Sequence, residues 1–147
     1  MRCQLANGRA GARGSATDLS PRALEIARGN ADRHGVEDRI TFVETDLFVD
    51  GAFDLVISNP PYVATPELKQ LPIDVQHEPR LALDGGGDGL DVIRRIIAGA
   101  RARAPWLLLE FGATQAAAAR NLALQAGYRD VQIHKDLDGF DRVLEAT

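Results

Sequence analysis

Short apolar runs alternate with longer segments of helical spacing along most of the 147-residue chain. This pattern predicts strands at residues 12–18, 40–44, 53–58 and 106–111, and helices at residues 20–34, 90–100 and 114–126. Ser20 and Pro21 suit an N-cap and the first helical position. Residues 128–134 and 140–144 predict a hairpin. The order of elements indicates an α/β fold, in which helices cover a mostly parallel sheet with a C-terminal β-hairpin.

Residues 65–83 interrupt this alternation with a polar stretch that several prolines break. The stretch is too long for a simple connection between two elements, and long connections in compact domains are commonly functional. We therefore expect residues 65–83 to face a substrate.

The composition predicts one soluble, cytoplasmic domain. The chain is 45% hydrophobic, which is typical of a single domain with one core. Its net charge of -4 provides no broad basic surface, so direct nucleic-acid binding is not expected. The lone Cys3 cannot form an internal disulfide, and no Cys and His residues have metal-ligand spacing, so no metal site is predicted. No apolar stretch is long enough for a membrane helix, and the start lacks the apolar core of a signal peptide.

Polar residues end three of the predicted strands. Ligands of open α/β sheets bind beyond the carboxyl ends of the strands, so these residues are candidates for one crevice. Asp18 can accept both hydroxyls of a ribose or cap the following helix, although Ser20 already suits that cap. Asp46 can accept an adenine amino group while Leu47 covers the ring, or both can belong to an ordinary loop. Asn59 ends the third strand.

The tetrapeptide Asn59-Pro60-Pro61-Tyr62 has the groups needed to hold a planar amide or amino group. Its two prolines fix φ and remove backbone donors, which leaves carbonyl groups to face a ligand. The side-chain oxygen of Asn59 and the carbonyl of Pro60 supply two acceptors, and Tyr62 supplies a flat face. An amide nitrogen is a poor nucleophile, so an enzyme that alkylates it must hold and orient it. The alternative is an ordinary proline-rich turn.

Several segments together resemble the release-factor glutamine methyltransferases. They are 16–21 (ATDLSP), 45–48 (TDLF), 53–62 (FDLVISNPPY), 77–79 (HEP), 84–91 (DGGGDGLD), 109–112 (LEFG) with Gln115, and 135–143 (KDLDGFDRV). The resemblance covers nearly everything after Ala16. The tetrapeptide alone is shared with adenine-N6 methyltransferases, but its combination with Glu78-Pro79 and the glycine-rich segment is much more specific.

The resemblance implies a Rossmann-like class I methyltransferase fold and S-adenosylmethionine as cofactor. It also implies N5-methylation of the glutamine side chain in the Gly-Gly-Gln loop of class 1 peptide chain release factors, which are then the partners. By the same resemblance, Asp18, Leu47 and Asn59 contact the cofactor. The resemblance further implies that Asn59, Pro60 and Tyr62 are catalytic, and that the substrate is bound by Asn59, Pro60, Pro61, Tyr62 and Glu78.

Two features depart from the family pattern. The Asp-x-Gly-x-Gly loop between the family's first strand and first helix is missing, and Gly8, Gly11 and Gly14 lack its spacing. The strand before that loop is missing too, and its expected neighbours in the middle of the sheet lose a partner. The sequence therefore predicts an atypical N-terminal segment, 1–15, and a partial catalytic domain, 16–147, truncated at the N-terminus.

Two alternatives to an active glutamine methyltransferase follow from these features. One is a non-catalytic remnant or fragment that binds a release factor through residues 65–89. The other is adenine-N6 methylation of nucleic acid, which requires a basic groove and stacking aromatic residues. The acidic balance and the 5% aromatic content count against this second alternative.

Overall fold

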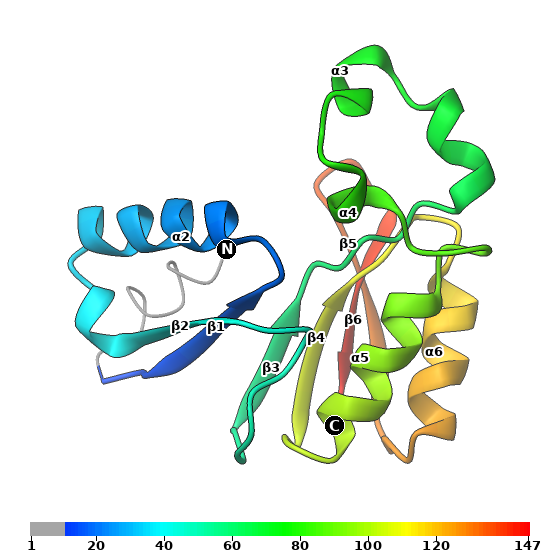
Figure 1. Ribbon diagram of the computed structural model, residues 1–147. Coiled ribbons are helices and arrows are strands. Elements are labelled where there is room, and N and C mark those ends of the chain that lie inside the picture. The colour runs from blue at the N-terminus through cyan, green and yellow to red at the C-terminus, as the bar shows by residue number, and fades with distance from the viewer. Residues whose placement is uncertain (1–10) are drawn as a thin grey trace. The chain divides into compact units, whose positions relative to one another are not determined.

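The computed structural model describes residues 11–147, which form two compact units (Figure 1). The first unit extends to Gly51 and the second begins at Ala52. The predicted boundary between residues 15 and 16 falls inside the first strand, and residues 1–10 of the N-terminal segment lie outside the described part. That boundary stays a prediction.

The first unit is a two-stranded parallel sheet with one long helix. Its elements are β1 (Gly14–Asp18), α2 (Pro21–Arg33), the short helix η1 (Glu37–Arg39) and β2 (Ile40–Glu44). Ser20 caps α2 as predicted, because its side chain accepts a hydrogen bond from the backbone N–H of Ala23 at 3.3 Å. Ala31 and Val36 are buried and pack with Phe42, so a small apolar core joins the helix to the sheet.

The second unit is a four-stranded mixed sheet in the order β3-β4-β6-β5. Its strands are β3 (Leu55–Ser58), β4 (Trp106–Glu110), β5 (Val131–Lys135) and β6 (Asp141–Ala146). Its helices are η2 (Thr65–Gln70), α3 (Ile73–Gln76), α4 (Arg80–Leu83), α5 (Asp91–Arg101) and α6 (Ala116–Gln125). β3 and β4 are parallel, whereas β6 is antiparallel to both β4 and β5. The predicted C-terminal hairpin is therefore confirmed.

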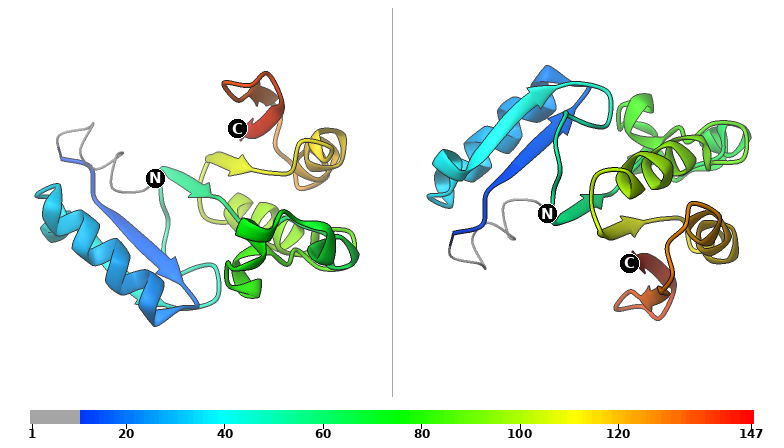
Figure 2. Two further views of the ribbon diagram at one scale, coloured as in Figure 1. Left: turned by 90° about the horizontal axis from the view of Figure 1, so that it is seen from above. Right: turned by 90° about the horizontal axis from the view of Figure 1, so that it is seen from below.

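The core of the second unit lies between the sheet and helices α5 and α6, which pack on the same face (Figure 2). Side chains of β4 alternate between the two faces, so Leu107 and Leu109 are fully buried whereas Trp106 is 47% exposed. Leu109 lies opposite Leu144 of β6, which is also fully buried. Burial of each such leucine stabilises the fold by about 1.5–3 kcal/mol, so this face holds the unit together.

The described residues form two separate sheets instead of one continuous sheet. β1 pairs with β2 and β3 pairs with β4, and no strand among residues 11–147 joins β1 to β3. The sequence predicts this gap, because the strand that the family places in the middle of the sheet is missing from its pattern. Each sheet is consequently small and has its own core.

The stretch 65–83 contains three short helices, η2, α3 and α4, rather than continuous irregular loop. A proline lies at the start of each: Pro66 is in the first turn of η2, and Pro72 and Pro79 are the N-caps of α3 and α4. A proline's fixed φ suits the start of a helix, and it cannot continue a helix already under way. The prolines therefore divide the stretch into short helices.

Within residues 11–147, no helix is long and apolar enough to cross a membrane. No cluster of three or more His, Cys, Asp and Glu residues with the potential to hold a metal ion occurs in this part of the chain.

Candidate functional site

In the first unit, Asp18 lies at the carboxyl end of β1 and is exposed. One of its carboxylate oxygens accepts a hydrogen bond from the backbone N–H of Ser20 at 2.8 Å. Ser20 itself caps α2, so the helix does not require Asp18 as its N-cap. Among the described residues, none donates a hydrogen bond to the second carboxylate oxygen of Asp18, so this oxygen is able to accept a hydrogen bond from a hydroxyl group of a ligand.

The turn after β2 lies beside the end of β1. The hydroxyl of Thr17 donates to the carbonyl of Leu47 at 2.7 Å, and the backbone N–H of Thr45 donates to the carbonyl of Asp18 at 3.2 Å. The structure therefore brings Asp18 together with Asp46 and Leu47. This agrees with the expectation that polar residues at the carboxyl ends of parallel strands lie close together. The sequence alone does not single out Thr17.

Leu47 has a backbone φ of 68°, the left-handed conformation that residues other than glycine rarely adopt. The hydrogen bond from Thr17 to the Leu47 carbonyl helps to hold this conformation. Strained backbone of this kind is concentrated at functional sites, where the surrounding structure maintains it. The conformation supports a special role for the turn that contains Asp46 and Leu47.

In the second unit, Asn59-Pro60-Pro61-Tyr62 follows directly after β3. Asn59 is exposed, Pro60 is buried, and Pro61 and Tyr62 are partly buried. Within residues 11–147, neither the Asn59 side chain nor the Pro60 carbonyl takes part in a hydrogen bond. Both predicted acceptors are thus available for a ligand.

The tetrapeptide continues into the base of the stretch 65–83. Val63 donates its N–H to the Leu83 carbonyl at 2.9 Å, and the Val63 carbonyl accepts from Gly85 at 2.8 Å. The hydroxyl of Thr65 donates to the carboxylate of Asp84 at 2.6 Å, and this bond is the main cause that lowers the pKa of Asp84. The two ends of the stretch are therefore fastened together next to the tetrapeptide.

Glu78 lies on the exposed turn between α3 and α4. Its backbone N–H donates to the carbonyl of Val75 at 3.0 Å. None of the hydrogen bonds among the described residues joins Glu78 to Asn59–Tyr62. The role of Glu78 in substrate binding therefore stays a prediction.

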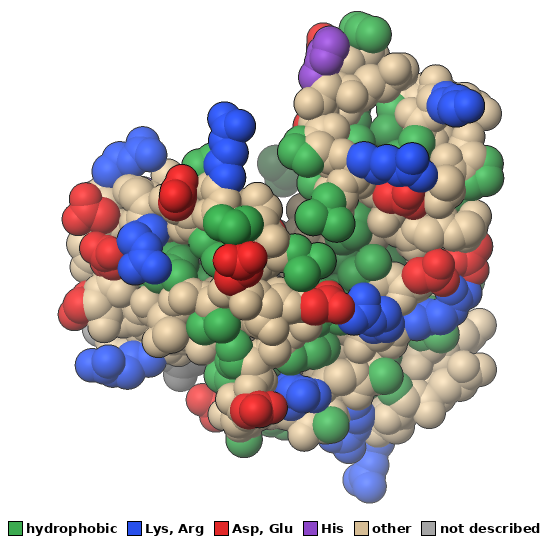
Figure 3. All heavy atoms as spheres, in the orientation of Figure 1, with side chains coloured by type: hydrophobic (Ala, Val, Ile, Leu, Met, Phe, Trp, Pro, Cys, Tyr) green, Lys and Arg blue, Asp and Glu red, His purple; other side chains and the backbone are tan. Residues whose placement is uncertain are grey.

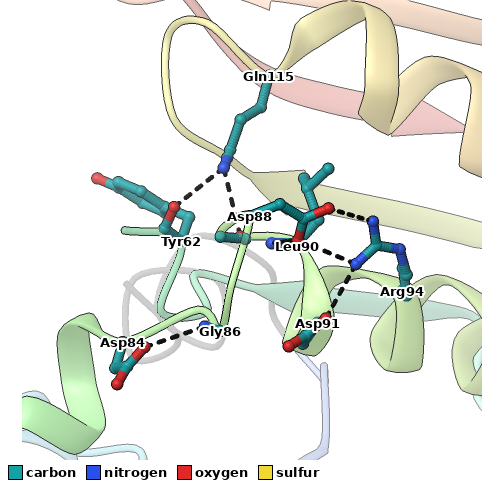
Figure 4. Close-up of polar contacts among 9 residues, drawn as sticks. Tyr62, Asp84, Gly86, Asp88, Leu90, Asp91, Arg94 and Gln115 are labelled. Atoms are coloured by element: carbon teal, nitrogen blue, oxygen red, sulfur yellow. Dashed lines mark hydrogen bonds and ion pairs between the residues drawn. The ribbon is translucent and has the colours of Figure 1, made fainter. Parts of the chain in front are cut away.

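The glycine-rich segment 84–91 packs closely against the tetrapeptide, and Figure 4 shows Tyr62 beside part of this segment. A Cβ atom at Gly85 would lie 2.6 Å from the carbonyl oxygen of Gly89 and 2.9 Å from that of Pro61. Gly86 and Gly89 have φ values of 93° and 75°, a backbone conformation that is strained for residues with a Cβ atom. Only glycines allow this turn to approach the tetrapeptide so closely.

An ion pair closes the same turn onto helix α5. The guanidinium group of Arg94 contacts the carboxylates of Asp88 and Asp91, and the Asp88 carboxylate also accepts from the backbone N–H of Leu90 at 3.0 Å. The hydrogen bonds from Arg94 are the main cause that lowers the pKa of Asp88 to about 2. These groups are at the surface, so they hold the turn rather than form a buried reactive site.

Residues at the ends of β1 and β2 fit the nucleoside part of a nucleotide cofactor. The Asp18 carboxylate has an oxygen able to accept hydrogen bonds from ribose hydroxyls, and Asp46 and Leu47 lie on the adjoining turn. A Cβ atom at Gly11 or Gly14 would have nothing within 4 Å, so close packing among the described residues does not require glycine at either position.

Comparison with solved structures assigns the fold to the class I methyltransferases. A methyltransferase from Pyrococcus furiosus superposes with a TM-score of 0.70 at 17% identity, over 99% of this chain and 68% of that chain. The N-terminal domain of human METTL16, solved in complex with SAH, superposes with a TM-score of 0.62 at 17% identity, over 100% of this chain and 56% of that chain. The predicted Rossmann-like methyltransferase fold is confirmed.

The sequence comparisons identify the family. The methyltransferase small domain model matches residues 2–122, and the chain belongs to this family. A release factor glutamine methyltransferase from Cereibacter sphaeroides is 46% identical over 144 residues, which cover 94% of this chain and 52% of that protein. A ribosomal protein uL3 glutamine methyltransferase from Bradyrhizobium diazoefficiens is 48% identical over 85 residues, or 56% of this chain and 27% of that protein. The predicted resemblance is confirmed, and the chain spans about half the length of the release-factor relatives it matches.

Proposed function

We propose that this chain carries the glutamine-binding part of an S-adenosylmethionine-dependent methyltransferase that modifies the side-chain nitrogen of the Gly-Gly-Gln glutamine in class 1 release factors. The observation that carries this proposal is the tetrapeptide Asn59–Tyr62 at the end of β3. It presents an exposed amide side chain and a neighbouring backbone carbonyl, and no other described group takes up either acceptor.

The chemistry of the substrate matches these groups. A primary amide has two N–H donors, and the Asn59 side-chain oxygen and the Pro60 carbonyl are two acceptors on adjacent residues. Hydrogen bonds from both N–H groups to these acceptors orient the amide nitrogen. The ring of Tyr62 packs against the amide plane and restricts its rotation. Catalysis then rests mainly on orientation, because the amide nitrogen need not be deprotonated before it attacks the methyl group and can lose its proton afterwards.

We infer cofactor-binding roles for Asp18, Asp46, Leu47 and Asn59 from the family resemblance. S-adenosylmethionine, when bound, supplies an electrophilic methyl group. Asp18 would hold the ribose hydroxyls with its carboxylate, Asp46 would accept the adenine amino group, and Leu47 would cover the adenine ring. Asn59 would contact both the cofactor and the substrate amide.

A release factor is the favoured substrate over ribosomal protein uL3. The relatives named for release factors match 86–94% of this chain, whereas the uL3 relatives match 56% and 64%. The residues outside the shared core therefore follow the release-factor pattern more closely. Both classes of relative are named for glutamine methylation, so the acceptor group is the same in either case.

A second candidate is a release-factor-binding protein without transferase activity. It is favoured by the glycine spacing of the sequence, in which Gly8, Gly11 and Gly14 do not form the Asp-x-Gly-x-Gly loop that lets backbone approach the methionine end of the cofactor. Adenine-N6 methylation has less support, because the surface shown in Figure 3 has basic and acidic side chains interspersed and the net charge is -4.

The test is a methyl-transfer assay with labelled S-adenosylmethionine and three acceptors: a class 1 release factor, the same factor with Gln→Ala in its Gly-Gly-Gln loop, and uL3. We expect label in the first acceptor alone. Asn59→Ala should lower transfer by about 100-fold, because the amide loses an acceptor and its orientation. Asn121→Ala, the same change at an exposed position of α6, is the matched control.

Each other outcome identifies an alternative. Release-factor binding without transfer would favour the non-catalytic protein. Label in uL3 alone would show that uL3 and not the release factor is the substrate. An RNA or DNA oligonucleotide is included as a fourth acceptor, and label in it would favour adenine methylation. Equal transfer by the Asn59→Ala and Asn121→Ala variants would remove the central claim.

A further inference from the structure

The side chain of Gln115 connects three backbone segments that are far apart in the sequence (Figure 4). Its amide nitrogen donates to the carbonyl of Tyr62 at 3.0 Å and to the carbonyl of Gly89 at 3.3 Å. Its amide oxygen accepts from the backbone N–H of Gly112 at 2.9 Å. Both N–H donors of the amide are used, and they join the tetrapeptide to the glycine-rich segment.

The backbone around this amide leaves little space for it to move. A Cβ atom at Gly89 would lie 2.7 Å from the Gln115 amide nitrogen, and one at Gly112 would lie 3.1 Å from its oxygen. The same Cβ at Gly112 would lie 3.4 Å from the ring of Tyr62. Glycines on two sides thus admit the Gln115 side chain and hold it against Tyr62.

This arrangement determines which acceptors the tetrapeptide presents. The Tyr62 carbonyl is bonded to Gln115, whereas the Asn59 side chain and the Pro60 carbonyl have no hydrogen-bond partner among the described residues. Between Asn59 and Tyr62 stand two prolines, each with a fixed φ. The segment from Asn59 to Tyr62 therefore has few free dihedral angles. Because Gln115 fixes the Tyr62 carbonyl at one end of this segment, it also restricts the orientation of Asn59 at the other end.

We propose that Gln115 is a positioning residue for the substrate amide. Its amide is bonded to backbone groups at both ends, so it acts through the backbone: it holds the Tyr62 carbonyl against the glycine-rich segment, and so keeps the acceptors of Asn59 and Pro60 directed at the substrate. The functional part of this inference rests on the proposed function, whereas the structural part concerns the chain alone.

The test compares the variants Gln115→Glu and Gln115→Met with the control Gln125→Glu. Gln115 is the N-cap of α6, and Gln125 is an exposed residue at the other end of that helix. Glutamate retains an oxygen that accepts from the Gly112 N–H, but places its second oxygen against the carbonyls of Tyr62 and Gly89, to which it cannot donate. Methionine has a similar length but makes none of these hydrogen bonds.

Hydrogen exchange in the full chain is measured first. We expect the amides of Val63, Gly85 and Asp91 to exchange about tenfold faster in both Gln115 variants, and the amides of β4 and β6 to be unchanged.

Methyl transfer to the release factor is measured second. We expect kcat to fall by about 10- to 100-fold in the Gln115 variants, while KM for the release factor stays within about threefold, because orientation is lost and not docking. An unchanged kcat despite faster exchange would overturn the positioning role. Unchanged exchange, or acceleration throughout β4 and β6 in both variants, would overturn the structural part. If the wild-type chain transfers no methyl group, the proposed function fails, and the exchange result still decides whether Gln115 holds the tetrapeptide.

Discussion

The substitution Gly89→Ala tests whether the glycine-rich segment is packed against the tetrapeptide as the structure has it. Gly89 is buried and has a φ of 75°. A Cβ atom there would lie 2.7 Å from the Gln115 amide nitrogen, 3.1 Å from the backbone nitrogen of Ala64, and closer still to the carbonyl oxygen of Tyr62. Two of these three atoms belong to the backbone, so a side-chain rotation cannot relieve the collision.

The expected loss of stability has two sources. A left-handed conformation costs a residue with a Cβ about 1–2 kcal/mol. Insertion of a methyl group into a closely packed site costs about 1–3 kcal/mol. Alanine also restricts the unfolded chain, which offsets about 0.4–1 kcal/mol. The free energy of unfolding should therefore fall by about 1–4.6 kcal/mol, a substantial part of the roughly 5–15 kcal/mol that is typical of a native domain.

The assay is urea unfolding followed by the fluorescence of Trp106, which is the only tryptophan of the chain and lies in β4. Gly87→Ala is the matched control, because Gly87 is exposed and a Cβ there has nothing within 4 Å. That variant should change the free energy of unfolding by less than about 0.5 kcal/mol. If both alanine variants unfold at the same urea concentration, the close packing of Gly89 against Tyr62 is wrong.

Two further predictions concern charge and core packing. The Asp88 carboxyl group should titrate near pH 2 in the folded chain, and Arg94→Met should move its pKa back toward 3.8; NMR titration of the carboxyl carbon measures both values. Because the folded pKa is depressed, ionised Asp88 stabilises the fold above pH 3.8, and this contribution is lost as the pH falls toward about 2. Leu109→Ala should lower the free energy of unfolding by about 2–5 kcal/mol, whereas Leu137→Ala, at a fully exposed hairpin position, should change it by less than about 0.5 kcal/mol in the same urea assay.

The secondary structure could be predicted largely from local sequence signals. Ser20 and Pro21 begin α2 where the cap pattern predicts, and β2 occupies residues 40–44 as its apolar run indicates. The C-terminal hairpin also follows from its two runs and the turn between them. These features depend on side-chain capping, proline geometry and period-2 burial, which act over a few residues and are therefore written in the local sequence.

The short helices between residues 65 and 83 were less predictable. Prolines and polar residues favour turns and single helical turns alike, and neighbouring structure selects between them. Here Val63 and Asp84 pair at the base of the stretch. That pairing fastens the two ends, and it joins residues too distant in the chain for a local pattern to indicate.

The sequence by itself determined the elements, the class of fold and the candidate tetrapeptide, because capping, hydrophobic period and the residue types of Asn59–Tyr62 are local properties. Only the tertiary structure decided the left-handed conformation of Leu47, the hydrogen bond from Thr17 to its carbonyl, and the position of Gln115 between Tyr62 and Gly89. The Gln115 contact with Tyr62 spans 53 positions and that with Gly89 spans 26. Contacts at such separations form only when strands and helices pack, since their free energy must first compensate for the entropy of closing the intervening loops.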